Sequence, residues 1–103
     1  MNKDEVLDMP AGKEIDYLID DKVFGMVNIS TGNPFESDLI PNYSTNMSDA
    51  WKVAEKSGVG MLNNVHGIWE CYVGNVVGKS KSAPLAICRA ALLAVVPANV
   101  GGV

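Results

Sequence analysis

The sequence contains a run of fourteen residues, APLAICRAALLAVV at 83–96, in which Arg89 is the one polar residue. A membrane-spanning helix needs about 20 apolar residues, so this run is too short to cross a bilayer. Ser82 precedes the run as a suitable helix cap, and Pro97 follows it and would end a helix. A helix that is apolar on all sides must be buried on more than one side. We therefore expect a buried helix over residues 83–96.

The length of the chain, 103 residues, indicates a single domain with one small core. In a domain of this size a sheet can cover one side of the buried helix, while a neighbouring helix or another subunit must cover the other side. We therefore expect a homo-oligomer that associates through the helix at 83–96. Residues 1–9 and 98–103 are expected to be frayed, as chain ends commonly are.

Residues 13–24 have the apolar period of an amphipathic helix, and Gly25 is expected to end it. Asp20 and Asp21 stand near its C-terminal end, where the helix dipole disfavours negative charge, so these acids either face water or meet a partner. The following residues, 26–43, have no clear period and are expected to form a long loop, with a short strand over 26–29 as an alternative. The apolar stripe of the helix consists of Ile15, Leu18, Ile19 and Val23.

A further helix is predicted within the segment YSTNMSDAWKVAEKS. Ser44 or Thr45 is the expected N-cap, because a hydroxyl can accept a hydrogen bond from a free amide of the first turn. Trp51 falls on the apolar stripe and is expected to lie in the core. Gly58 is expected to end the helix. The stripe consists of Met47, Ala50, Trp51 and Ala54.

Residues 59–65 and 68–73 are predicted to form a β-hairpin whose turn is His66-Gly67. In the second strand, alternation places Trp69, Cys71 and Val73 on one face. A third short strand is predicted over 75–78, where β-branched residues occur. His66, the sole histidine, is expected on the surface.

Charge and motifs exclude several classes of function. The net charge of −4 disfavours long nucleic acid, which needs a basic stripe. Cys71 and Cys88 lack metal-ligand spacing and are expected to be buried thiols, so no metal site is predicted. The start MNKDEVLDM is acidic and has no apolar core, so we do not expect it to be a signal peptide. Phosphate-binding glycine loops and the Gly-x-Ser-x-Gly elbow are absent from the sequence, so we expect no catalytic residues and no cofactor.

The remaining polar and aromatic residues suit the binding of a small anionic molecule. Aromatic rings can stack a planar base, and Arg89 and Lys81 can hold a phosphate. Ser44 and Thr45, at a helix start, can receive an anion through hydroxyl and amide groups. A structural role is the alternative for each; the guanidinium of Arg89, for example, can reach solvent along its aliphatic stem. The candidate ligand-binding residues are Arg89, Tyr43, Ser44, Thr45, Trp69 and Lys81.

Three segments, GKEIDYLIDDKVFG, YSTNMSDAW and APLAICRAALLAV, resemble in order and spacing the phage ABA sandwich domain family. The resemblance implies an α+β fold in which helices sandwich a small antiparallel sheet, in an α/β/α three-layer arrangement. It also implies an origin in a bacteriophage or prophage, and so a place in the cytoplasm of the infected bacterial host. This chain carries KSKS at 79–82, which is more basic than the family norm and favours an anion there.

Three functions are compatible with these observations. The first is a non-catalytic sponge that sequesters a nucleotide-derived messenger of host antiviral defence, with Arg89 meeting a ligand phosphate between subunits. The second is a protein that binds and inhibits a host protein through an acidic face formed by Asp16, Asp20 and Asp21. The third is a metal-free enzyme that cleaves a nucleotide, which would require His66.

Overall fold

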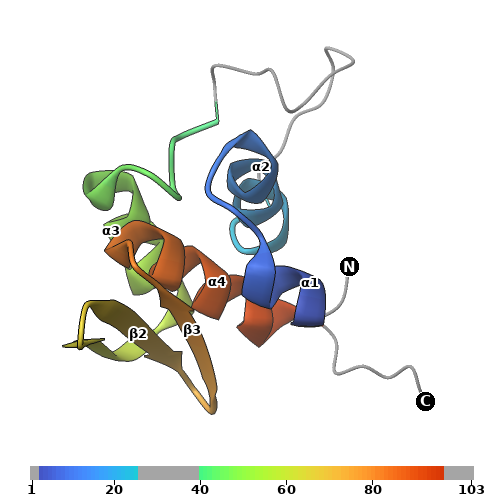
Figure 1. Cartoon of the computed structure of the whole chain (residues 1–103). Helices are drawn as coiled ribbons and strands as arrows, with labels where there is room; N and C mark the ends of the chain where they lie inside the picture. Colours follow the sequence, from blue (N-terminus) through green and yellow to red (C-terminus); the bar gives the residue numbers. More distant parts are fainter. Residues whose placement is uncertain (1–2, 26–39, 97–103) are drawn as a thin grey trace.

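The computed structural model describes residues 3–25 and 40–96, which form four helices and three strands (Figure 1). The loop at 26–39, with the alternative strand at 26–29, and the tail at 98–103 lie outside the described residues. The elements, in chain order, are α1 (Lys3–Asp8), α2 (Lys13–Lys22), α3 (Met47–Ser57), β1 (Val59–Val65), β2 (Ile68–Val73), β3 (Val76–Ser80) and α4 (Ala83–Val95).

The three strands form one antiparallel sheet in the order β1-β2-β3. The predicted hairpin at 59–73 is confirmed, and its turn has positive φ angles at His66 (54°) and Gly67 (84°). Cys71 and Val73 of β2 are buried on the face that alternation assigned to them. The third strand begins one residue later than predicted and continues to Ser80.

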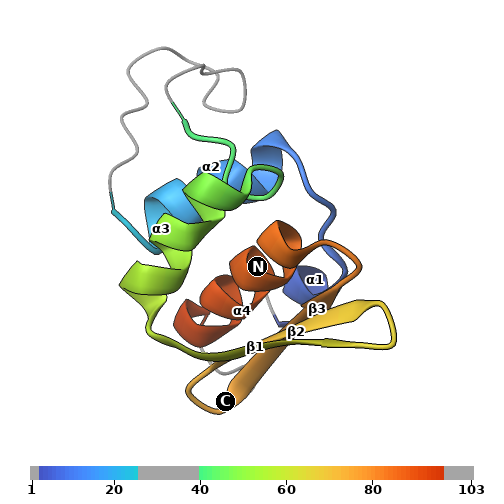
Figure 2. The same ribbon diagram turned by 90° about the vertical axis from the view of Figure 1, so that its left-hand side faces the viewer.

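Helix α4 lies between the sheet and the pair formed by α2 and α3 (Figure 2). It contacts β2 and β3 on one side and the other three helices on its remaining sides. Eight of its thirteen residues are buried. The α+β class and the small antiparallel sheet packed with helices are therefore confirmed. The layers run from the sheet to α4 and then to α2 and α3, so the middle one of the three layers is α4 and not the sheet. A helix with apolar residues on all sides suits this central position.

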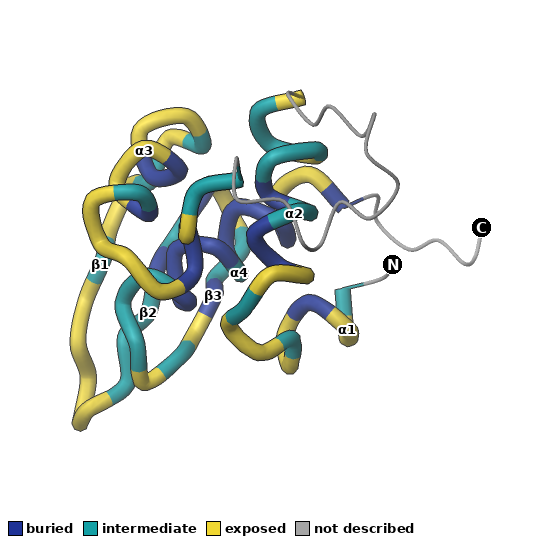
Figure 3. The backbone as a smooth tube through the Cα atoms, turned by 90° about the horizontal axis from the view of Figure 1, so that it is seen from above, coloured by how far each residue is buried: buried dark blue, intermediate teal, exposed yellow. Residues whose placement is uncertain are grey.

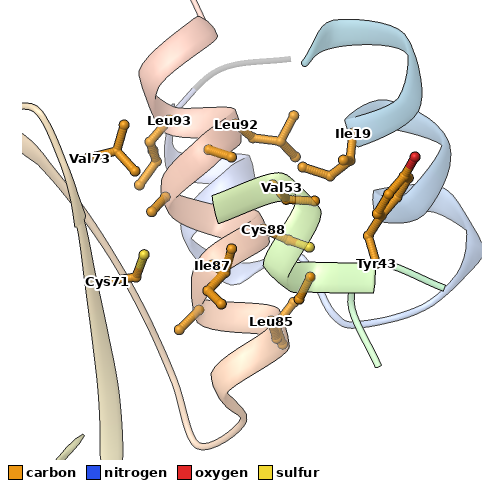
Figure 4. Packing of buried hydrophobic residues seen from close by; sticks show 14 of the residues in the cluster. Ile19, Tyr43, Val53, Cys71, Val73, Leu85, Ile87, Cys88, Leu92 and Leu93 are labelled. Carbon is orange, nitrogen blue, oxygen red and sulfur yellow. The ribbon is translucent and has the colours of Figure 1, made fainter. Parts of the chain in front are cut away.

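The residues that pack on α4 belong to the same chain (Figure 4). Because one chain buries α4, the reason for expecting association through residues 83–96 no longer applies, and association itself stays a prediction. The end of α4 agrees with the sequence, since Val96 has the extended backbone typical of a residue before proline. The covering residues include Val6 from α1, Ile15 and Ile19 from α2, Ala50, Val53 and Ala54 from α3, and Cys71 and Val73 from β2.

The strand β3 and the helix α4 approach so closely that no side chain fits between them at Gly78. A Cβ atom on Gly78 would lie 2.5 Å from the carbonyl oxygen of Ala86 and 2.9 Å from the Cα of Ala90. Ala86 and Ala90 are themselves fully buried. Small residues on both sides therefore set the distance between sheet and helix.

The expectations for residues 3–8 and for Trp51 are wrong. Residues 3–8 form α1 instead of a frayed end, because Val6 is fully buried against the core. Trp51 is 51% exposed, since α3 turns the smaller residues Ala50, Val53 and Ala54 toward α4. In the part of the chain that is described, no helix is both long and apolar enough to cross a membrane.

Candidate functional site

The six candidate binding residues lie in two parts of the structure. One group stands in the turn that leads into α3, and the other lies around the connection between β3 and α4. The first group is Tyr43, Ser44 and Thr45, and the second is Trp69, Lys81 and Arg89.

Ser44 joins α2 to the turn before α3 and has no free donor for a ligand. It is fully buried, and its amide donates to Oδ1 of Asp16 at 2.8 Å. Its hydroxyl accepts from the amide of Gly12 at 3.0 Å and donates to the carbonyl oxygen of Gly12 at 3.5 Å. Burial raises the pKa of the Asp16 carboxyl, while the hydrogen bonds from Ser44 act in the opposite direction. Ser44 therefore satisfies a buried carboxylate.

Tyr43 is also part of the internal packing. Its hydroxyl donates to Oδ1 of Asp20 at 2.8 Å, and its ring stacks on Phe24 with the ring centres 5.3 Å apart. Burial and the bond to Asp20 raise the pKa of Tyr43 above its ordinary value. With only 5% of the residue exposed, its ring has no open face on which a base could stack.

The N-cap of α3 is Asn46, so the expected cap at Ser44 or Thr45 is wrong. The side chain of Asn46 accepts from the amide of Asp49 at 3.0 Å, and the carboxylate of Asp49 accepts from the amide of Asn42 at 3.1 Å. Thr45 is exposed. An acidic residue thus already stands at the positive end of the α3 dipole.

The same contacts bear on the acidic face considered for a host protein. Asp16 is buried and Asp20 accepts from Tyr43, so two of its three carboxylates serve contacts within the chain. Asp21 lies 3.5 Å from the ammonium of Lys22 on the surface. These contacts therefore do not favour the three aspartates as a binding face for a host protein.

Arg89 donates hydrogen bonds to two backbone carbonyls outside its own helix. Its Nε and Nη2 donate to the carbonyl oxygen of Met9, at 3.1 and 2.9 Å, and its Nη1 donates to the carbonyl oxygen of Lys79 at 2.7 Å. Partial burial lowers the pKa of the guanidinium, and the nearby charge of Asp8 opposes this shift. Arg89 therefore ties α4 to the end of β3 and to the link between α1 and α2.

The beginning of α4 differs from the beginnings of the other described helices. The first turns of α1, α2 and α3 each contain an acidic residue, whereas the first turn of α4 has none. Ser82 occupies the N-cap position, but its side chain makes no cap hydrogen bond. Lys81 precedes it and is exposed. The positive end of the α4 dipole is thus reinforced by a cation and not neutralised by a local acid.

Trp69 lies at this same corner, which we call the α4 corner and define as Trp69, Ser80, Lys81 and Ser82. Trp69 pairs with Ser80 across the sheet and is partly buried against the core. The hydroxyl of Ser80 accepts from the amide of Ser82 at 3.0 Å. Lys81 therefore follows directly after the residue that pairs with Trp69. The sequence reasoning missed Ser82 as a site residue, although the basic segment followed by an acid-free helix start could have indicated it.

The two thiols contribute to packing. Burial raises the pKa of Cys71 to about 11, and it also raises the pKa of Cys88. Both thiols are therefore protonated at neutral pH and are poor nucleophiles. Among residues 3–25 and 40–96, no three side chains of the metal-binding types gather into a cluster.

Taken together, the internal helix, the three-stranded sheet and the basic helix start define a small α+β sandwich protein. The phage ABA sandwich domain family matches residues 17–92, and the chain belongs to this family. Among solved structures it is similar to a phage protein from Bacillus cereus ATCC 14579, with 30% identity and a TM-score of 0.57 over 78% of this chain and 83% of that one. No curated protein matches the sequence.

Proposed function

We propose that this protein binds a small anionic, nucleotide-like molecule without catalysing a reaction, and that it sequesters a nucleotide-derived messenger of host defence in the host cytoplasm. The observation that carries the proposal is the α4 corner. A helix start presents amide donors and a partial positive charge of about half a unit, which favours a phosphate. The exposed ammonium of Lys81 adds a full charge at the same place.

The residues of the corner suit the two parts of a nucleotide. The hydroxyl of Ser82, which is not used as a cap, is a donor for a phosphate oxygen. The indole of Trp69 is partly exposed and offers an apolar surface to a base or sugar. Arg89 supports the site indirectly, because it holds the carbonyl of Lys79 and so fixes the end of β3.

Binding without catalysis is supported by the contacts of the reactive side chains. Asp16, Tyr43 and Arg89 serve hydrogen bonds within the chain. Both cysteines are buried, and His66 is exposed in a turn. None of these groups is arranged as a nucleophile with an adjacent base.

Calorimetric titration of the purified protein with cyclic dinucleotides and ADP-ribose derivatives tests the proposal. Lys81→Glu is expected to weaken binding by a factor of about 10 or more, which corresponds to 1.4 kcal/mol. Lys56→Glu, an exposed change of the same charge at the far end of α3, is the matched control and is expected to leave binding unchanged.

Ser82→Asp separates the stability of the helix from the binding of an anion. An aspartate at the N-cap is expected to stabilise α4 by about 0.5–1 kcal/mol, because it supplies the missing cap and a favourable charge. The same carboxylate is expected to abolish anion binding. Absence of heat across the whole panel, together with no small molecule released by denaturing protein purified from infected cells, would overturn the proposal.

A further inference from the structure

The strand β1 forms one edge of the sheet, and its outer side has no strand partner among the described residues. Edge strands recruit other strands unless charge, proline or a covering segment prevents this. The sequence of β1, VGMLNNV, has no charged residue and no proline, and five of its seven residues are exposed. A bulge also protects an edge, but the one in β1 lies between Val59 and Met61, at the beginning of the strand, and the pairing is regular from Met61 to Val65 (Figure 3 shows the exposed strand). This edge is therefore open to pairing.

The opposite edge of the sheet, β3, is closed by several features. The strand has only five residues and carries the charged side chain of Lys79. The carbonyl oxygen of Lys79 is already bonded to the guanidinium of Arg89. Short length and an edge lysine are features that prevent edge-to-edge association. The described sheet thus has one open edge and one closed edge.

The outer face of the sheet, which points away from α4, carries apolar side chains that continue to the open edge. Met61 of β1 pairs with Tyr72 of β2, which in turn pairs with Val77 of β3. Val65 pairs with Ile68 near the hairpin turn. Met61 is 53% exposed and Val65 is 42% exposed. A strand added beside β1 would cover both of these side chains.

We infer that β1 pairs with β1 of a second copy of this chain, antiparallel and about a two-fold axis, so that the two sheets become one sheet of six strands. With the axis at Asn63, each Met61 faces Val65 of the other copy on the same side of the sheet, and Asn63 faces Asn63. This arrangement places no like charges opposite one another, because β1 has no charge. Since each sheet has a single open edge, the pairing closes at a dimer and does not extend into a fibre.

This register also accounts for the exposure of Trp51. A surface hollow of about 150 Å³ lies between α3 and the start of β1 and is lined by Trp51, Ala54, Glu55 and Val59. In an antiparallel pair centred on Asn63, the hairpin turn of the second copy comes beside Val59. The turn then covers the hollow and part of the indole.

Sedimentation equilibrium of the full chain over about 1–500 μM tests the inference. The wild-type protein is expected to show twice the chain mass of 11.0 kDa at the upper concentrations. Asn63→Lys and Asn63→Glu, each measured alone, are expected to be monomers, because like charges then meet at the axis. An equimolar mixture of the two variants is expected to restore the dimer.

Asn75→Lys is the control, since Asn75 is exposed in the turn between β2 and β3, away from the open edge. It is expected to associate like the wild type. A wild type that is monomeric throughout, or charged variants that associate as the wild type does, would overturn the inference. Far-UV circular dichroism confirms that each variant is folded. Because Lys81 lies outside this interface, Lys81→Glu is expected to dimerise normally, so a failure of the nucleotide proposal is distinguishable from a failure of this one.

Discussion

Replacing Gly78 by alanine tests how closely the sheet and α4 are packed. The added Cβ would lie 2.5 Å from the carbonyl oxygen of Ala86 and closer still to the amide nitrogen of Ala90. Both of these atoms belong to the helix backbone, so no side-chain rotation can relieve the contact. Because ordinary contacts begin near 3.4 Å, β3 and α4 must separate by about 1 Å.

A separation of this size acts on the whole interface between α4 and the sheet. A gap of about 0.5–1 Å forfeits roughly a quarter to a half of the dispersion energy of each contact across it. Overpacking of a core typically costs about 1–3 kcal/mol, and rigid backbone on both sides of Gly78 places this change at the upper end. We therefore expect the free energy of unfolding to fall by about 3 kcal/mol, out of the roughly 5–15 kcal/mol of a typical domain.

Urea unfolding followed by circular dichroism measures this change. With a slope of about 1.5–2 kcal/mol per molar, the midpoint is expected to fall by about 1.5–2 M. Gly60→Ala is the matched control, because Gly60 also lies in a strand but its nearest atom, the oxygen of Tyr72, would be 3.9 Å from a new Cβ. Its stability is expected to stay within about 0.5 kcal/mol of the wild type. Equal midpoints for the two variants would refute the packing argument.

Arg89→Ala is expected to lower the free energy of unfolding by about 2–3 kcal/mol in the same assay, because two carbonyl groups lose a charged donor; an unchanged midpoint would mean that the guanidinium only reaches solvent. The free energy of unfolding of Asp16→Asn is expected to equal or exceed that of the wild type at pH 7, because the raised pKa of Asp16 means that folding disfavours the charged carboxylate. This difference in stability is expected to shrink as the pH falls through that pKa. A difference that grows on acidification would contradict this. Asp16→Ala is expected to lose about 1–3 kcal/mol, because the Ser44 amide keeps no acceptor. Cys71 and Cys88 are expected to react with a coloured thiol reagent only after denaturant is added, and rapid labelling of the native protein would show that they are accessible.

The sequence was informative where local pattern decides the structure. The bounds of β1 and β2 were predicted correctly, because alternation and a two-residue turn act over a few neighbours. The beginning of α4 was likewise marked by Ser82. These signals depend on adjacent residues and need no knowledge of what packs against them.

The sequence was less informative where two local solutions compete. In α3, a stripe centred on Trp51 and a stripe centred on Val53 both have helical period. Ala50 and Ala54 belong to both stripes. Close packing against α4 selects the second one, because the smaller side chain of Val53 allows a closer approach than the indole of Trp51 does. The N-cap of α3 presents the same difficulty, because Ser44, Thr45 and Asn46 are all suitable caps. In the structure Ser44 hydrogen-bonds the buried carboxylate of Asp16, and Asn46 is the cap.

The candidate site was predictable only in part, because its partners are mainly backbone groups. The carbonyls of Met9 and Lys79, which hold Arg89, have no side-chain signature in the sequence. The positive charge of Lys81 could be read directly, and its position beside Trp69 followed once the register of β2 and β3 was known. The expected oligomer interface on α4 was inferred from apolarity alone, which does not tell whether the cover comes from the same chain.

The central position of α4 has a consequence for the order in which the protein is made. The helix that every other described helix contacts follows all of them in the sequence, so the earlier segments emerge from synthesis before their common partner exists. Arg89 reaches back 80 residues to Met9. Domains usually fold as units once their sequence has emerged. For this protein, the core can therefore close during translation only after residues 83–96 are free, and until then the buried faces of α1, α2 and α3 lack the helix that covers them.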